Sequence, residues 1–153
     1  DDLGSRGLGD VYKRQVIEQL AKPMEIYKNP KSLFVAKFVG SPQMNTVDFN
    51  DGEQLALSLL SKTKFEKNNV KTLGIRPESI KLTSKDNGDI NGKIETIQPT
   101  GADWIVGLNI SGKSIFAISS DQPPGNENDT IGLSFKLDGL HAFDRNDLKL
   151  DVD

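Results

Sequence analysis

The spacing of hydrophobic and polar positions along the 153-residue chain changes near residue 44. Before this point, residues 31–39 carry an apolar stripe at helical spacing, formed by Phe34, Val35, Phe38 and Val39. Gly40 follows where a left-handed C-terminal cap is expected, and Pro42 prevents the helix from continuing. A shorter apolar segment begins at Pro23 and stops at Asn29-Pro30. The pattern therefore predicts a hairpin of two short helices.

Beyond residue 44 the apolar positions recur at every second residue in short runs, which is typical of half-buried β-strands. These runs cover residues 46–49, 55–59, 72–76, 79–82, 90–97, 104–110, 114–118, 131–137 and 140–143. Turn-forming residues separate them, at 50–52, 86–88, 99–101 and 123–125. Many short strands with such spacing predict a small antiparallel barrel of the OB type, so the expected fold class is mainly β with a helical hairpin before it.

The two ends of the chain show weaker patterns. Residues 1–15 combine three glycines with scattered charges and have neither helical nor strand periodicity, which predicts a disordered leader. Residues 147–153 alternate charged and apolar positions, which fits either an edge strand or a frayed tail.

Composition narrows the classes of partner. The chain has 19 Lys and Arg against 22 Asp and Glu, so it lacks the basic excess on which nucleic-acid binding relies. It contains no cysteine, which excludes disulfides and thiolate metal sites and suits a reducing cytoplasm. No apolar run approaches the roughly 18 residues that a membrane-spanning helix needs.

Residues 107–114 read GLNISGKS and match the phosphate-binding loop pattern, with Gly107, Gly112, Lys113 and Ser114 at its fixed positions. A working loop needs a strand before it and a helix after it, so that backbone N–H groups converge on the phosphates. Here the alternation of apolar residues continues through the motif, and β-branched and aromatic residues follow it. We therefore interpret the match as a decoy and predict a β-hairpin that turns at Ser111-Gly112.

The chain shows no constellation of residues for catalysis or for metal binding. His141 is the single histidine, and a metal site needs several convergent ligands, so its expected role is structural. The carboxylates are dispersed over turns and strand ends, and no serine lies in a nucleophile motif. We accordingly expect no catalytic residue, no metal and no cofactor in this chain.

Two short segments are candidates for interaction or structural roles. In residues 74–78, GIRPE, the proline biases Arg76 toward an extended conformation, so that Arg76 and Glu78 are expected to form a charged pair at a strand exit. The other candidate is the single tryptophan, Trp104, with Gly101 and Asp103 in the preceding turn. A lone tryptophan on a strand is typical of a core or interface anchor.

Several motifs together resemble a known family. Residues 22–46, KPMEIYKNPKSLFVAKFVGSPQMNT, resemble the end of the nucleotide-binding domain in ATP-binding subunits of carbohydrate-type ABC importers, the maltose, glycerol-phosphate and multiple-sugar classes. LGIRPESIKL at 73–82, the segment 95–118 and GLSFKLDGLHAFD at 132–144 resemble later elements of the same family. The likeness covers residues 16–144 and excludes the leader, in which VYKRQ departs from the family pattern.

The resemblance implies a division of the chain into three parts. Residues 1–15 are a leader foreign to the family, 16–43 are the helical end of a missing nucleotide-binding domain, and 44–153 are an OB-type domain, also called TOBE or MOP-like. In that family this domain helps two ATPase subunits to pair and receives regulatory signals. ATP and Mg²⁺ belong to the ATPase domain of the intact parent, so the parent is expected to be an ATPase although this chain is not.

The resemblance also implies the partners and the location. The expected partners are the parent's own ATPase domain, a second copy of the subunit and, through the parent, the membrane permease subunits, with no nucleic acid. The expected location is the cytoplasm, peripheral to the inner face of the plasma membrane. An alternative remains, namely an autonomous OB-type module that binds a small oxyanion, a sugar or an oligonucleotide.

Overall fold

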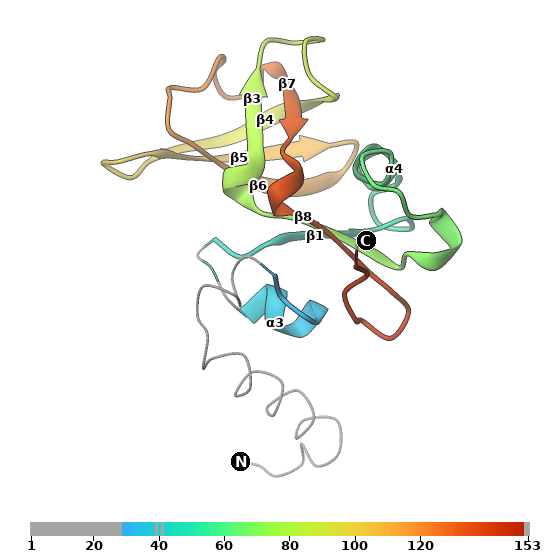
Figure 1. The fold of residues 1–153 in the computed structure, drawn as a ribbon. Helices are drawn as coiled ribbons and strands as arrows, with labels where there is room; N and C mark the ends of the chain where they lie inside the picture. The colour runs from blue at the N-terminus through green and yellow to red at the C-terminus, as the bar shows by residue number, and fades with distance from the viewer. Residues whose placement is uncertain (1–28, 39, 41, 152–153) are drawn as a thin grey trace.

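The computed structural model describes residues 29–38, 40 and 42–151, which form a mainly β structure with two sheets (Figure 1). The helices are α3 (Leu33–Phe38) and α4 (Glu53–Leu60), with short 3₁₀ turns η2 (Lys67–Asn69), η3 (Pro77–Ser79) and η4 (Leu137–Gly139). The strands are β1 (Asn45–Asp48), β2 (Thr72–Ile75), β3 (Ile80–Thr83), β4 (Ile90–Pro99), β5 (Trp104–Ile110), β6 (Lys113–Ser119), β7 (Thr130–Phe135) and β8 (Leu140–Phe143). The predicted leader and the first helix of the predicted hairpin lie outside the described residues.

The strands form a three-stranded sheet in the order β1-β2-β8 and a five-stranded sheet in the order β3-β7-β4-β5-β6. Every pair is antiparallel, and β4 changes register between Ile94 and Thr96. Both sheets curl around one core, as in a half-barrel. The predicted fold class, mainly β and of the OB type after a short helical segment, is confirmed.

The core lies between the two sheets and follows the alternation of the strands. On β5, Val106, Leu108 and Ile110 point inward and are buried, as the sequence predicts. Leu73 and Ile75 contribute the inner face of the three-stranded sheet. Buried positions at period two on both sheets therefore meet in a single apolar cluster.

The predicted strand at 55–59 is wrong, because this segment lies within helix α4. Leu55, Ala56 and Leu59 are buried against the core, whereas Leu57 is 43% exposed. That pattern of i, i+1 and i+4 is helical, and the sequence EQLALSLL consists largely of strong helix formers. The leucines at alternate positions match the period of a strand, and this match is why the sequence predicted one.

Helix α3 packs on the outer face of the three-stranded sheet, which therefore lies between α3 and the five-stranded sheet (Figure 1). Val35 and Ala36 are buried, whereas Phe34 is 38% exposed, so the buried face differs from the predicted stripe. Val39 lies outside the described residues, and the same holds for the side chain of Phe38. Gly40 has a φ of 103°, which agrees with the predicted left-handed cap.

The C-terminal segment is paired on both sides as far as Leu150, so it is neither the frayed tail nor the edge strand that the sequence left open for residues 147–153. Leu150 N–H donates to the Ala142 carbonyl on β8. On the other side, Lys149 N–H donates to Lys31 and Leu33 N–H donates to Asp147. The C-terminal segment thus joins β8 to the residues that lead into α3.

Candidate functional site

The contact between α3 and the barrel, here called the joint, is built around the end of β2. Arg76 is buried, 2% exposed, and its guanidinium Nη1 donates a hydrogen bond to the Ala36 carbonyl on α3 at 3.3 Å. Burial lowers the pKa of Arg76 from its usual value. A buried, charged donor that bonds a helix carbonyl fixes the position of α3 more strictly than apolar contact alone.

Apolar packing supports the joint. Ala36, Met44 and Phe143 form a separate buried cluster on the outer face of the sheet, with Leu33 packed against it. A Cβ atom added to Gly74 would lie 2.4 Å from the Met44 sulfur, so the glycine of the GIRPE segment leaves the space that Met44 occupies. Two motifs that are thirty residues apart in the sequence are therefore complementary halves of one contact.

His141 lies in the same joint, opposite Gly74 in the β2–β8 pairing. Its side chain is 8% exposed, and within the described part of the chain its Nε2 atom has no hydrogen-bond partner. Burial lowers the pKa of His141 to about 4, with further contributions from the positive charges of Lys149 and Arg76. The imidazole is therefore neutral at physiological pH.

The predicted pairing of Arg76 with Glu78 is wrong. Arg76 turns inward beneath α3, whereas Glu78 is exposed in η3, and no ion pair joins the two side chains in the described ranges. Pro77 does hold Arg76 in an extended conformation, with φ −67° and ψ 140°. The conformation was therefore predictable, but the direction of the side chain depends on α3.

The second candidate segment forms the β4–β5 hairpin loop. Gly101 has a φ of 97°, and Thr100 N–H donates to the Asp103 carbonyl at 2.8 Å, which closes the loop. Trp104 is half-buried and packs against the edge of the core, next to Pro99 and Ser119 on the neighbouring strands. The structure places these three candidates together at the β4–β5 hairpin of the five-stranded sheet, whereas the joint is built on the three-stranded sheet.

Residues 107–114 form the end of β5, a tight turn and the start of β6, as predicted. Ser111 and Gly112 have φ values of 51° and 97°, which is the geometry of a type I′ hairpin turn. Lys113 is in a strand and forms an ion pair with Asp51 at 3.0 Å, so it is less solvated than expected. Burial acts to raise the pKa of Asp51, but the Lys113 ammonium and backbone N–H groups lower it overall. No helix follows the motif to supply the phosphate-binding geometry.

Two side chains that the sequence did not single out organise the fold. The Asn45 amide donates to the Ile75 carbonyl at 3.2 Å and to the Phe116 carbonyl at 2.8 Å, and it accepts from Phe116 N–H at 2.9 Å. The Asp144 carboxylate accepts from the N–H groups of Asn146 and Leu148, which turns the C-terminal segment back onto β8. Asn45 is next to last in the resembling segment 22–46, and Asp144 is the last residue of the segment 132–144. Their place in these segments was the signal by which sequence reasoning could have found them.

Within the described ranges, no three His, Asp or Glu side chains gather as a metal site would require. None of the helices that the structure describes is long and apolar enough to cross a membrane. The features that distinguish this chain are therefore the joint and the surface of the barrel.

Comparison with known proteins agrees with this geometry. Residues 73–143, from β2 to the end of β8, match the model of the TOBE domain. These residues belong to the TOBE domain family. The match begins in β2, which directly precedes Arg76, and ends with β8, which carries His141, so both barrel residues of the joint lie within the matched segment.

Similar curated proteins are sn-glycerol-3-phosphate import ATP-binding proteins. One from Rhizobium johnstonii is 36% identical over 133 residues, which are 84% of this chain and 37% of the relative. One from Pectobacterium atrosepticum is 33% identical over 143 residues, 88% of this chain and 40% of the relative. One from Vibrio vulnificus is 30% identical over 152 residues, which are 93% of this chain and 41% of the relative. The chain thus spans about two fifths of the length of these relatives, and the similarity extends beyond the TOBE domain itself.

Proposed function

We propose that this chain is the accessory part of an importer ATPase subunit, in which the TOBE domain regulates the subunit and helps two copies to pair. The parent would hydrolyse ATP with Mg²⁺ in a separate domain and drive uptake of a carbohydrate or glycerol-phosphate type of substrate through permease subunits. The parent would then lie in the cytoplasm at the inner face of the plasma membrane. The names of the relatives support this assignment.

The observation that carries the proposal is the joint. The segment that resembles the end of a nucleotide-binding domain is fastened to the TOBE domain by the Arg76 bond to Ala36 and by backbone pairing of residues 31–33 with 147–149. A rotation of the preceding domain would therefore move the barrel with it. Such rigid coupling is what a domain needs in order to sense or to limit the pairing of ATPase subunits.

A chimera tests this proposal. The aligned segment of the Pectobacterium atrosepticum relative would be replaced by the matching residues of this chain, and the subunit reconstituted with its permease in vesicles. We expect nucleotide-dependent pairing and substrate-stimulated ATP hydrolysis in the chimera, and weaker pairing when Arg76→Met loosens the joint. Lys85→Gln, a change of an exposed lysine far from the joint, serves as the matched control.

Pairing and regulation are separate readouts of this experiment. Sedimentation with and without nucleotide reports pairing, and the stimulation of ATP hydrolysis by loaded binding protein reports regulation. If a subunit that lacks the replaced segment paired and was stimulated to the same extent, the accessory role would be refuted.

A further inference from the structure

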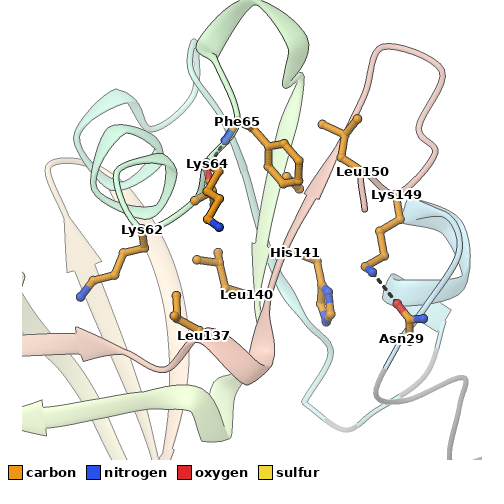
Figure 2. Close-up of a pocket in the computed structure, with 11 residues that line it drawn as sticks. Asn29, Lys62, Lys64, Phe65, Leu137, Leu140, His141, Lys149 and Leu150 are labelled. Atoms are coloured by element: carbon orange, nitrogen blue, oxygen red, sulfur yellow. Dashed lines mark hydrogen bonds between the residues drawn. The ribbon is translucent and has the colours of Figure 1, made fainter. Parts of the chain in front are cut away.

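A pocket of about 310 Å³ lies beside the joint, between the loop after α4, strand β8 and the C-terminal segment (Figure 2). This volume is at the lower end of the range of small-molecule sites, which is about 300–1,000 Å³. One wall is apolar and consists of Phe65, Leu140 and Leu150, each of them half-buried against the core. Because these side chains belong to the packed barrel, the wall keeps its shape without a ligand.

The polar part of the lining is cationic. Among the described residues it contains Lys62, Lys64 and Lys149, together with the neutral side chains of Asn29, Thr63 and His141, and no Asp or Glu. Lys62 extends away from the pocket in Figure 2 and forms an ion pair with Asp89 at 2.9 Å. The pocket itself is therefore governed by the other two lysines and the histidine.

The charges of Lys64 and Lys149 are poorly compensated. Lys64 runs down over Leu140 toward the centre of the pocket in Figure 2, and no ion pair is found for it within the described ranges. Lys149 donates to Asn29, and its ion pair with Asp151 is long, 3.5 Å, to a carboxylate that is 78% exposed. Water screens an exposed carboxylate, so Asp151 offsets the charge of Lys149 only in part.

His141 responds to this field. After burial, the positive charges of Lys149 and Arg76 are the causes that hold its pKa low. An anion placed near Lys149 would offset that positive charge and raise the pKa of His141. The pKa of His141 therefore reports whether negative charge occupies the pocket.

We propose that this pocket binds a small organic anion, with a carboxylate or phosphate group between Lys64 and Lys149 and an apolar body against Phe65. The two ammonium groups line the same pocket and supply the charge complement, and the apolar wall supplies the preference for an organic body over a bare ion. Because Asn29 also lines the pocket, a bound ligand contacts both the barrel and the segment that leads into α3. The proposal does not depend on the function proposed above.

The experiment uses the whole chain and four probes: phenyl phosphate, benzoate, benzyl alcohol and inorganic phosphate. Because His141 is the only histidine, its ring resonances in NMR spectra are unambiguous. We expect a saturable shift of these resonances with one or both aryl anions, and a higher pKa of His141 in their presence. Stronger binding of phenyl phosphate or of benzoate supports the proposal and identifies the head group.

Matched variants locate the site. Lys64→Gln is expected to weaken binding of the aryl anion about fivefold or more, whereas Lys85→Gln, on an exposed lysine outside the pocket, leaves the dissociation constant unchanged. Equal effects of the two variants, equal binding of benzyl alcohol, or the absence of saturable shifts at millimolar probe would overturn the proposal. Inorganic phosphate that binds as tightly as phenyl phosphate would refute its organic part.

Discussion

Asn45 joins the two sheets through its side chain, since its amide bonds the backbone of Phe116 on β6 and the carbonyl of Ile75 on β2. We predict that Asn45→Ala lowers the free energy of unfolding by about 1–2 kcal/mol, because three backbone groups at the seam each lose their hydrogen bond to the amide. Urea unfolding followed by Trp104 fluorescence measures the change.

Asn68→Ala is the matched control for Asn45, because Asn68 is exposed in η2, outside the strands that meet at the seam. It should change the free energy of unfolding by less than about 0.5 kcal/mol. Equal costs for the two substitutions would contradict the role of Asn45 in holding the sheets together.

His141 makes the stability of the chain depend on pH. Its pKa falls from 6.5 to about 4 on folding, so between these values the unfolded chain binds a proton that the folded chain does not. Protonation of the unfolded chain therefore lowers the free energy of unfolding. This loss of stability is absent above about pH 6.5 and grows progressively as the pH falls toward about 4. At about 1.4 kcal/mol per pH unit, the loss amounts to about 3 kcal/mol.

The measurement compares the wild type with His141→Gln, which keeps a neutral polar side chain that does not titrate. Denaturation midpoints at several pH values should converge with those of the variant as the pH falls, since only the wild type loses the histidine contribution. Carboxylates titrate in both proteins and cancel in the difference. Parallel pH profiles would show that the histidine is not held neutral by the fold.

At the scale of elements, the sequence predicted what alternation alone determines. Strands β5 and β8 have the predicted bounds, and the other six differ by one or two residues at their ends. The prediction failed for the segment that forms α4. Leu55, Leu57 and Leu59 satisfy the strand period, while the segment EQLALSLL also satisfies the helical period. Two patterns that fit the same residues are separated only by packing, in which Leu57 faces solvent and Ala56 faces the core.

A pair of truncations tests the helical assignment of this segment. Leu59→Ala should cost about 2–4 kcal/mol in the free energy of unfolding, because Leu59 is 0% exposed and its removal leaves a cavity in the core. Leu57→Ala, two residues away on the exposed face, should cost less than about 0.5 kcal/mol. In a strand the two leucines would share one face, and similar costs would therefore favour the strand.

Because residues 107–114 form the β5–β6 hairpin, we predict that this phosphate-loop pattern does not bind nucleotide. Calorimetry of this chain with Mg²⁺ and ATP should give no saturable heat, since a strand follows Gly112 and Lys113 is engaged with Asp51. Lys113→Ala should lower the free energy of unfolding by less than about 1 kcal/mol, because the pair is partly exposed. A micromolar affinity for ATP that Lys113→Ala abolishes would reverse this conclusion.

The joint was less predictable than the strands. Pro77 determines the backbone of Arg76, yet the side chain finds its partner on Ala36, forty residues earlier in the chain. The pairing of residues 31–33 with 147–149 spans almost the whole described chain. No local pattern contains such contacts, although Gly74, Met44 and Asp144 lie in the motifs that the resemblance selected.

On the scale of the whole molecule, the exposed apolar side chains are distributed over separate elements. The large ones are Phe34, Leu57, Phe116, Leu137 and Leu148, which lie on α3, on α4, on β6, in η4 and in the C-terminal segment. Such scattered side chains are normal for a soluble surface. Within residues 42–151, the described part of the barrel, these side chains do not form a large apolar face of the kind that permanent dimers bury.

We accordingly predict that this chain alone is mainly monomeric at micromolar concentration, and that self-association appears when the parent ATPase domain is restored. Interfaces well below about 1,200 Å² are usually weak or transient, so two barrels without ATPase domains have too little area to remain together. Sedimentation velocity on the chain with and without that domain, and with nucleotide, measures both halves of the claim. A tight dimer of the chain alone would make the barrel the dominant contact, whereas a restored subunit that stayed monomeric with nucleotide bound would remove the pairing role altogether.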